Sequence, residues 1–414
     1  MDQALTIDSG DTAWMLIATT LVMLMVLPGL ALFYGGLVRA KNLLSVMSQV
    51  LGLTAVAILI WVGWGYSLAF ADGNAMVGGL GKLGLAGIDG DSAWAVGSAG
   101  KAIPELLFVA FQMSFAAITA ALVIGALVER VRFAAVMLFA ALWLTIVYAP
   151  LAHMVWASHG LLFAMGAIDF AGGTVVHINA GIAGLVGALF AGPRIGHLKE
   201  AMPPHSLALT MVGAGLLWVG WFGFNAGSAL EANGLAAVAM INTLVAPAAG
   251  VLAWMGIERV VSGKPSMLGG ASGAVAGLVA VTPAAGASGP LGAMLLGAVA
   301  SLACYGFVGS LKNRLKLDDS LDVFGIHGLG GIVGSIGTAL VALPALGGHG
   351  GADYAVGHQL LVQIGAVAVA IAWSAAGSAA CFALVRRITP LRFDRERERE
   401  GLDLSDHGER AYNY

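Results

Sequence analysis

Eleven long apolar segments constrain this chain more than any other feature of its sequence. Cutting at charged, Pro-rich or Gly/Asp-rich breaks leaves segments near or above the ~20 residues that a helix needs to cross a bilayer. They cover residues 12–37, 43–71, 103–128, 133–152, 170–192, 206–229, 235–258, 267–286, 288–311, 323–344 and 357–385. Continuous apolar runs are typical of helices, since barrel strands give short alternating segments. The sequence therefore predicts an all-α integral membrane protein with eleven transmembrane helices.

The composition agrees with a membrane protein. Hydrophobic residues make up 59% of the chain and charged residues 10%, against about 25% charged in a soluble domain. The 60 glycines among 414 residues are about twice the usual share and suit helices that pack through small residues. The net charge of −3 gives no indication of nucleic-acid binding. Cys304 and Cys381 both lie in apolar segments, so we expect packing residues rather than a disulfide or metal site.

The Lys and Arg residues predict the orientation. With eleven spans, the loops after odd-numbered spans and the C-terminal tail together hold 18 of the 20 basic residues. The other two, Lys82 and Lys101, share one loop on the opposite side. Basic residues concentrate on the cytoplasmic side of membrane proteins, so we expect the N-terminus outside and the C-terminus in the cytoplasm. The first ten residues lack the basic start of a cleavable signal.

Two histidines lie within segments that carry almost no charge. An aspartate precedes each of them, Asp169 before His177 and Asp322 before His327. Glycines follow both histidines at the same offsets, four, seven and ten residues later. Small residues at this spacing let two helices approach closely, so we expect the two imidazoles to meet inside the protein. Either histidine alone could be a structural core residue, but ionisable groups inside a span usually mark a substrate or proton path.

The positions of the histidines predict an inverted repeat. His177 lies in the fifth span and His327 in the tenth, so spans 1–5 and 6–10 would enter the membrane from opposite sides. A pseudo-two-fold axis in the membrane plane is a recurrent transporter plan, with the site at the midplane. We expect a membrane domain over residues 1–386, with halves at about 12–192 and 206–344 and a peripheral extra helix at about 357–385, and a cytoplasmic tail over 387–414.

Five longer motifs carry a family resemblance. They are Pro28-Gly-Leu-Ala-Leu-Phe-Tyr-Gly-Gly36, Ala152-His-Met-Val-Trp156, Asp169-Phe-Ala-Gly-Gly-Thr-Val-Val-His-Ile-Asn179, Gly220-Trp-Phe-Gly-Phe-Asn-Ala-Gly-Ser228 and Asp322-Val-Phe-Gly-Ile-His-Gly328. In this order they closely resemble the bacterial ammonium transporter (Amt) family, which is grouped with methylammonium permeases and Rhesus proteins. The resemblance extends from the first span into the tail. It implies ammonium uptake across the bacterial inner membrane, with methylammonium as a further candidate substrate and no cofactor.

The resemblance also implies roles for three residues at the outer mouth and two below it. Phe111, Trp156 and Ser228 would bind ammonium, because aromatic faces attract a cation by about 0.5–2 kcal/mol and a hydroxyl accepts a hydrogen bond. Phe115 and Phe224 would be stacked rings that close the pore until they swing aside. Phe111 and Phe115 are four residues apart and therefore share one helix face. Ordinary packing, or an interfacial position for Trp156, is the alternative for the aromatic residues.

Below these rings the resemblance places His177 and His327 in a narrow apolar pore. Desolvating a bare ammonium ion costs far more than cation–π contact returns, so only neutral ammonia should pass. The implied mechanism is deprotonation near the outer mouth, passage of ammonia and reprotonation on the cytoplasmic side. Two neutral imidazoles in contact can exchange tautomers. We hypothesise that the released proton crosses by this pair with water, which makes transport electrogenic.

Asp169 is implied as an essential acidic residue at the outer end of the fifth span. A carboxylate at a helix start can accept the free N–H groups of residues 171–174, so we interpret it as a cap. Proton acceptance is the alternative. The remaining polar residues within or beside spans are expected to form hydrogen bonds between helices; they are His153, Asn179, Asn225 and Thr282.

The tail and the partners follow from the resemblance. Residues 395–400 alternate in charge, which suits an exposed or subunit-facing segment. The family implies a homotrimer whose tails couple the subunits, and a PII-type signal protein at the cytoplasmic face.

Three other functions compete with this interpretation. An intramembrane hydrolase would need a nucleophile motif such as Gly-x-Ser-x-Gly, which the chain lacks. An ammonium sensor could use the same scaffold while conducting little. A passive ammonia channel of the Rhesus type differs only in carrying no charge.

Overall fold

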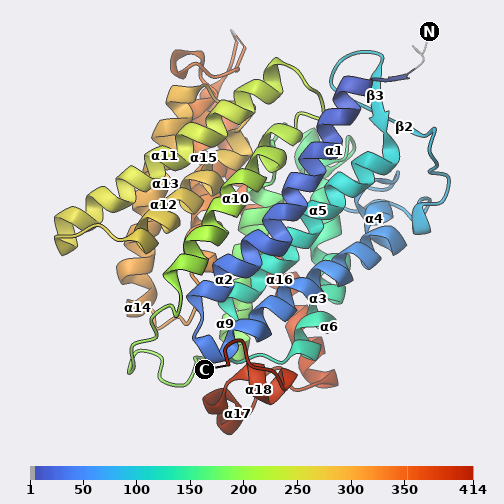
Figure 1. The fold of residues 1–414 in the computed structure, drawn as a ribbon. Coiled ribbons are helices and arrows are strands. Elements are labelled where there is room, and N and C mark those ends of the chain that lie inside the picture. The colour runs from blue at the N-terminus through green and yellow to red at the C-terminus, as the bar shows by residue number, and fades with distance from the viewer. Residues whose placement is uncertain (1–4, 352, 414) are drawn as a thin grey trace.

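The computed structural model describes residues 5–351 and 353–413 as one bundle of long helices (Figure 1). Among these residues, eleven helical segments are long and apolar enough to cross a membrane, as predicted. They are Ser9–Leu37, Ala40–Phe70, Glu105–Ala126, Phe133–Ala164, Gly173–Ala191, Leu207–Gly227, Gly234–Ser262, Met267–Ala284, Pro290–Arg314, Phe324–Val341 and Val356–Ile388. The count agrees because apolar length is a local property that the sequence carries directly.

Several spans are built from more than one helical segment. The α-helices are α1 (Ser9–Leu24), α2 (Ala31–Leu37), α3 (Leu43–Ile60), α4 (Tyr66–Phe70), α5 (Glu105–Val123), α6 (Phe133–Trp143), α7 (Ala149–Trp156), α8 (Leu161–Ala164), α9 (Asn179–Ala191), α10 (Leu207–Gly227), α11 (Gly234–Ser262), α12 (Met267–Val281), α13 (Pro290–Gly306), α14 (Lys312–Arg314), α15 (Leu329–Val341), α16 (Val356–Ile388), α17 (Arg395–Glu400) and α18 (Leu402–His407). Short 3₁₀ turns cover Ala40–Asn42, Leu83–Leu85, Ile124–Ala126, Thr282–Ala284 and Pro344–Leu346.

Six π-helical turns interrupt these spans. They are Met25–Leu30, Trp61–Gly65, Leu144–Tyr148, Gly173–Ile178, Phe307–Leu311 and Phe324–Gly328. Both histidines singled out in the sequence lie in such turns, His177 in the fifth span and His327 in the tenth. Turns of this kind are rare and often mark functional sites.

The fourth span runs further than predicted. The prediction ended it at residue 152, before His153, but α7 continues to Trp156. The helix accommodates His153 because both ring nitrogens lie against backbone carbonyls, Nδ1 at 2.9 Å from Ala69 O and Nε2 at 2.7 Å from Asn74 O. A polar side chain with such partners need not end a span.

The two ends of the bundle differ. The N-terminal end carries a small sheet in the order β1-β3-β2, formed by β1 (Thr6–Ile7), β3 (Lys101–Pro104) and β2 (Ala93–Ala95). The C-terminal end carries the tail helices α17 and α18 (Figure 1). The tail lies on its own chain: Asp403 Oδ1 accepts from Ser45 N at 2.8 Å, and Leu402 N donates to Asn42 Oδ1 at 2.9 Å.

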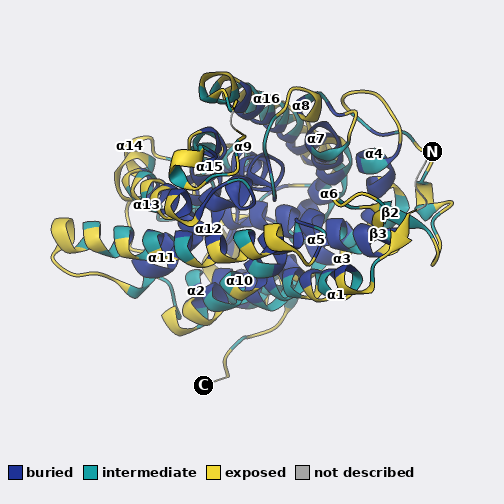
Figure 2. Cartoon of the chain, turned by 90° about the horizontal axis from the view of Figure 1, so that it is seen from above, coloured by how far each residue is buried: buried dark blue, intermediate teal, exposed yellow. Residues whose placement is uncertain are grey.

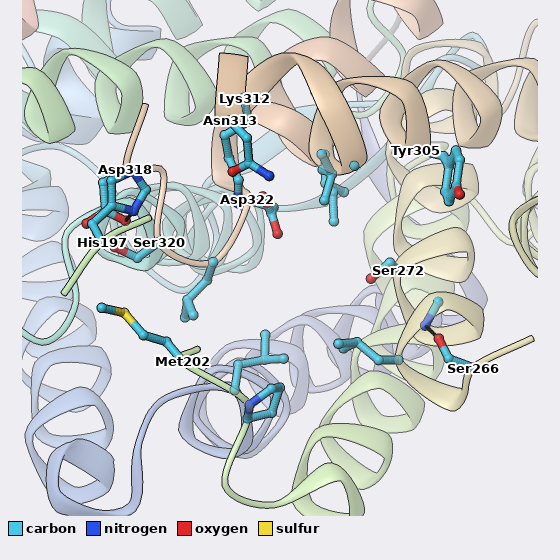
Figure 3. A pocket seen from close by; sticks show the side chains of 18 of the residues that line it. His197, Met202, Ser266, Ser272, Tyr305, Lys312, Asn313, Asp318, Ser320 and Asp322 are labelled. Atoms are coloured by element: carbon cyan, nitrogen blue, oxygen red, sulfur yellow. Dashed lines mark hydrogen bonds and ion pairs between the residues drawn. The ribbon is translucent and has the colours of Figure 1, made fainter. Parts of the chain in front are cut away.

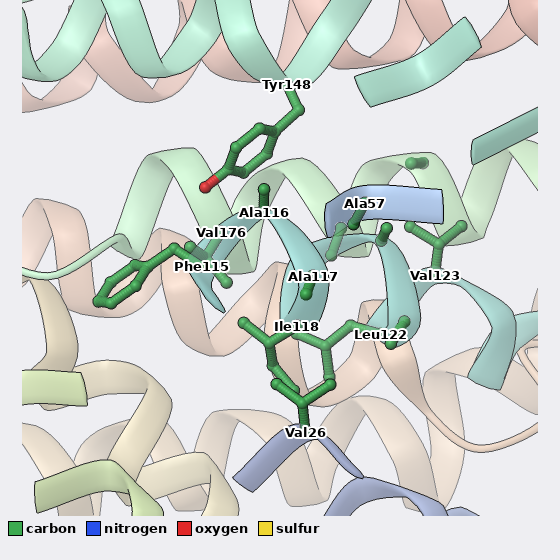
Figure 4. Packing of buried hydrophobic residues seen from close by; sticks show 14 of the residues in the cluster. Val26, Ala57, Phe115, Ala116, Ala117, Ile118, Leu122, Val123, Tyr148 and Val176 are labelled. Carbon is green, nitrogen blue, oxygen red and sulfur yellow. The ribbon is translucent and has the colours of Figure 1, made fainter. Parts of the chain in front are cut away.

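Burial separates inner from outer helices. α5 is buried almost throughout and packs small and branched side chains on its neighbours (Figure 4), whereas α11 and α16 present apolar side chains such as Leu252 and Leu361, which are 72% and 70% exposed. Seen from above, buried residues fill the centre and exposed ones the rim (Figure 2). Exposed leucines at the rim suit contact with lipid. As predicted, the eleventh span lies at this rim.

The glycine repeat packs the fifth span on the tenth. An added Cβ at Gly181 would lie 2.3 Å from Gly328 Cα, and one at Gly331 would lie 3.1 Å from Gly173 O and from His177 Cβ. Only glycine permits the first of these approaches. The two helices thus touch at equivalent places on either side of the histidines, as the matched offsets predicted.

Candidate functional site

Aromatic side chains from three spans gather near the N-terminal end of the bundle. The Phe111 and Phe115 centroids are 4.9 Å apart on α5, and Trp156 meets Phe115 edge-on at 6.0 Å. Gly227 lies against the Phe111 ring, where an added Cβ would be 3.0 Å from Cε2. Ser228 follows Gly227 at the end of α10, and its Oγ donates to Phe224 O at 2.8 Å. The structure therefore brings the predicted binding residues into one neighbourhood, the N-terminal mouth.

Phe115 and Phe224 are stacked. Their centroids are 4.1 Å apart with planes inclined by 8°, and both rings are fully buried. Rings this close leave no room for a solute between them. The stacked pair therefore lies between Trp156, whose centroid is 6.0 Å from that of Phe115, and His177, whose centroid is 6.0 Å from that of Phe224.

His177 and His327 meet directly beneath this pair. Their Nδ1 atoms are 3.3 Å apart and the ring centroids 5.3 Å, with the Phe224 centroid 6.0 Å from that of His177. Both side chains are buried, with 1% and 6% of their surface exposed. One nitrogen of the contact donates and the other accepts, so the pair must hold complementary tautomers.

A residue that the sequence analysis missed covers the other side of His177. The Trp221 ring stacks on it with centroids 5.5 Å apart, and its Nε1 donates to Thr282 Oγ1 at 2.9 Å. Trp221 belongs to the motif at residues 220–228 and lies three positions before Phe224. Helical spacing therefore offered a signal that was not used.

Asp169 caps the turn that carries His177. Its carboxylate accepts from the backbone N–H groups of Gly172 at 2.8 Å, Gly173 at 2.5 Å, Thr174 at 2.8 Å and Val175 at 3.2 Å, and from the Thr174 hydroxyl. The prediction placed these donors one residue too early, at 171–174. The shift arises because Gly172 adopts φ +114°, so the π-helical turn starts later. Asp169 O also accepts from Trp156 Nε1 at 3.0 Å, which ties the cap to the aromatic cluster.

In the second half of the chain, Asp319 is the counterpart of Asp169. The sequence analysis matched Asp322 with Asp169, and that prediction is wrong. Asp319 accepts from the N–H groups of Val323 at 2.9 Å, Phe324 at 2.8 Å and Gly325 at 3.1 Å. It precedes His327 by eight residues, as Asp169 precedes His177. Equal distance to the histidine was the signal that could have found it. Asp322 instead pairs with Lys312.

A pocket of about 510 Å³ opens at the C-terminal end of the bundle, the C-terminal mouth. Figure 3 shows Lys312 above Asp322, with Asp318 and His197 on one side and Tyr305 on the other. Ile326, next to His327, also lines this pocket. Charged groups therefore approach the histidine pair from this end, whereas aromatic rings approach it from the other.

Ion pairs join four loops beside this pocket. Arg194 contacts Asp318 at 2.8 Å and Glu129 at 3.1 Å, and Arg39 contacts Glu129 at 2.8 Å. Burial alone would raise the pKa of the Asp318 carboxyl, but hydrogen bonds and charge from Arg194, with the charge of Arg130, hold this pKa well below its usual range. Burial, with the Asp322 charge, raises the pKa of the Asp319 carboxyl to about 6.

The remaining polar predictions are mostly confirmed. Asn225 Nδ2 donates to Thr243 Oγ1 at 3.0 Å, and Thr282 accepts from Trp221, so both join helices. The prediction for Asn179 is wrong, because its Nδ2 donates to Val175 O within its own span at 3.1 Å. The π-helical turn shifts backbone bonding by one residue there and leaves a carbonyl to be satisfied.

Known proteins match this chain over nearly its whole length. The model of the Ammonium Transporter Family matches residues 13–412. An ammonium transporter of Aquifex aeolicus is 48% identical over 413 residues, covering 98% of this chain and 94% of that protein. The crystal structure of Saccharomyces cerevisiae Mep2 has a TM-score of 0.84 and 35% identity, covering 94% of this chain and 88% of that one. The solved structure of a sensor Amt protein has a TM-score of 0.85 and 26% identity, covering 96% and 98%.

Proposed function

Since this chain belongs to the ammonium transporter family and is an ammonium transporter, we propose that it deprotonates ammonium at the N-terminal mouth and conducts ammonia past the histidine pair. The observation that carries this proposal is the 3.3 Å contact between His177 Nδ1 and His327 Nδ1 beneath a closed pair of aromatic rings. An apolar passage with two imidazoles in contact suits a neutral solute and a separate path for protons.

Recognition takes place among Phe111, Trp156 and Ser228. Trp156 Nε1 is occupied by Asp169 O, so this side chain offers its aromatic face rather than its N–H. The Ser228 hydroxyl donates its proton to Phe224 O and keeps its lone pairs for an ammonium N–H. Aromatic faces and an acceptor oxygen together favour a cation that donates hydrogen bonds.

Passage requires Phe115 and Phe224 to separate. Their stacking excludes a hydrated ion, because a buried charge without partners is costly. Ammonia, once formed, needs only a brief opening of the ring pair. Below the rings, His177 and His327 take up the hydrogen bonds of ammonia in turn, and water completes the relay that carries the proton.

The C-terminal mouth returns a proton to ammonia. The carboxylates of Asp319 and Asp322 and the ammonium group of Lys312 lie at or near the pocket, so proton donors and bulk water are both within reach. We place this mouth in the cytoplasm and the N-terminal mouth outside, in a bacterial inner membrane. This assignment follows the segregation of 18 of the 20 basic residues. The division into a membrane domain, 1–386, and a tail, 387–414, belongs to the same proposal.

The assembly forms part of the proposal too. We expect a homotrimer, with a PII-type protein at the C-terminal mouth. The buried carboxylate of Asp403 and the ion pair of Arg392 with Glu398 hold the tail beside that mouth. A tail in this place can report the state of one subunit to a neighbour.

Currents test the mechanism. Ammonium jumps on proteoliposomes that carry the wild-type protein should give a transient current on a solid-supported membrane. The paired change His177→Leu with His327→Leu should reduce it by at least about 100-fold, because proton transfer through a positioned imidazole contributes that much. The Cys381→Ser variant, buried in α16, serves as a matched control. A full ammonium-dependent current without either imidazole would exclude the relay.

Sensing is the second candidate function, favoured by the likeness to a sensor Amt protein. A sensor would bind ammonium at the aromatic cluster with little current. The wild-type measurement above separates the two, and a passive channel would move ammonia without charge.

A further inference from the structure

Gln363, on the eleventh span, reaches from the rim of the bundle to the loop that holds Asp169. Its side chain is buried, with 1% exposed. Nε2 donates to Ile168 O at 2.9 Å and to Ser335 O at 2.7 Å, while Oε1 accepts from Ile168 N at 2.8 Å. Oε1 also accepts from Gln359 Nε2 at 3.3 Å. A carboxamide has two N–H donors and an oxygen with two lone pairs, so every hydrogen-bonding position of Gln363 is filled.

These bonds fix the backbone on one side of Asp169. On its other side, Phe170 N donates to Pro283 O at 3.1 Å. Asp169 is therefore held between two anchored neighbours, one tied to α16 and one to the second half of the chain. Its carbonyl in turn receives Trp156 Nε1, so the place of the indole depends on the place of this short loop.

We propose that Gln363 is a positioning residue for ammonium recognition, which acts through Ile168 and the Asp169 carbonyl on the indole of Trp156. Gln363 does not itself touch the aromatic cluster. The inference rests on the proposed function, because that proposal gives Trp156 its part in binding. The eleventh span belongs to neither half of the inverted repeat. The inference gives this span a part in the recognition of substrate.

Gln363→Met is the informative change. Methionine is similar in length but replaces the amide by a thioether, so the backbone groups of Ile168 and Ser335 lose their partners. The half-saturation concentration for ammonium-evoked current in proteoliposomes should rise about tenfold, the equivalent of one lost buried hydrogen bond. The maximal current per folded protein should stay close to that of the wild type.

The ammonium concentration at half-maximal current does not depend on how much of the protein folds. It therefore distinguishes a positioning role of Gln363 from a purely structural one. A purely structural Gln363 would lower the maximal current and leave half-saturation unchanged, and that result would overturn the inference. Ser374→Ala is the matched control: it also removes a buried hydrogen bond from α16, to Asn179 O at 2.9 Å, but not one to the Asp169 loop. It should leave half-saturation as in the wild type.

Trp156→Leu distinguishes the inference from the function on which it rests. If this change leaves half-saturation unaltered, the aromatic site itself is wrong. If it raises half-saturation and Gln363→Met does not, only the inference about Gln363 is lost. In the Trp156→Leu background, Gln363→Met should add nothing further, because both changes act on one contact. A second, independent tenfold rise would contradict the route through Trp156.

Discussion

Two equivalent carboxylates, each eight residues before one histidine of the pair, have different surroundings. At the N-terminal mouth Asp169 lies among aromatic rings, whereas at the C-terminal mouth Asp319 lies among charged groups. Asp169 is tied through its carbonyl to Trp156. Asp319 lies instead beside Lys312, whose Nζ is 3.3 Å from Asp319 O. Both carboxylates cap a π-helical turn, and each turn carries one histidine of the pair.

The difference shows how a repeated scaffold can present two unlike ends to one histidine pair. The parts that fix the backbone are duplicated: the cap, the π-helical turn, the histidine and the glycines behind it. The side chains around these parts are not duplicated. Aromatic faces suit the capture of a cation, and titratable groups that line an open pocket suit proton exchange with the water that enters it. The side chains therefore make the two ends of the repeated scaffold different, although its backbone features are the same at both ends.

Removing the caps should have the largest effect. Asp169→Ala leaves four backbone N–H groups without an acceptor and Asp319→Ala leaves three, each worth about 1–3 kcal/mol when buried. We expect both changes to reduce the ammonium-evoked current more than about 100-fold. Asp169→Ala should also yield less folded protein than Asp319→Ala, because it leaves more N–H groups without an acceptor. Normal transport by Asp319→Ala would contradict the equivalence of the two caps.

Asp169→Asn sharpens the same comparison. Asparagine removes the charge and keeps one of the two acceptor oxygens, so two of the four backbone N–H groups retain their partner. If capping is the role of Asp169, the variant should fold and keep part of the current. Size-exclusion chromatography and current recordings on one preparation measure both. Ammonium-evoked current in the folded variant would exclude proton acceptance by Asp169, whereas a folded variant without any current would contradict capping as its whole role.

The ion pairs at the C-terminal mouth should matter next, through stability. Asp318→Ala removes one of the two buried carboxylates that pair with Arg194 and leaves Glu129 as the other. It should cost about 3–5 kcal/mol of unfolding free energy, seen as a lower unfolding temperature in detergent. The N-terminal mouth has an exposed pair, Lys101 with Asp8. Lys101→Ala should cost less than about 1 kcal/mol. Equal losses at the two ends would refute the contrast between them.

Trp156→Leu should have an intermediate effect on recognition alone. Losing one aromatic face removes about 0.5–2 kcal/mol of cation binding. Half-saturation for ammonium should therefore rise about 2- to 30-fold. The unfolding temperature should change no more than in the control Trp373→Leu, a half-buried indole on α16 whose Nε1 donates to Val147 O at 3.2 Å. A change in maximal current with constant half-saturation would place Trp156 outside the binding site.

The smallest predicted effect is the loss of stability at acidic pH. The pKa of Asp318 is lowered in the folded protein, so its contribution to stability is present above the ordinary aspartate value of about 3.9. That contribution is lost as the pH falls below this value toward the folded pKa. Unfolding temperature should thus fall with acidification in the wild type and fall less in Asp318→Asn. If the unfolding temperatures of the two proteins fell equally as the pH decreased, Asp318 would not be the acid-sensitive group.

Some of the site followed from the sequence and some did not. The meeting of His177 and His327 was predicted because glycine offsets report how closely helices pack. Asp319 was missed because Asp322 lies nearer to the histidine, and only the hydrogen bonds separate the carboxylate that caps a turn from the one that pairs with Lys312. Asn179 was misassigned because a π-helical turn cannot be read from apolar spacing.

The sequence by itself determined the eleven spans, their alternating direction and the glycine contact between the fifth and the tenth. Apolar length, the placement of basic residues and small-residue spacing are properties of neighbouring residues, so they survive without knowledge of the fold. Only the tertiary structure decided that Trp221 covers His177, that Asp319 matches Asp169 and that Gln363 anchors Ile168. A buried polar or aromatic side chain takes its role from whichever distant segment packs against it, and that partner is fixed only when the whole bundle has closed.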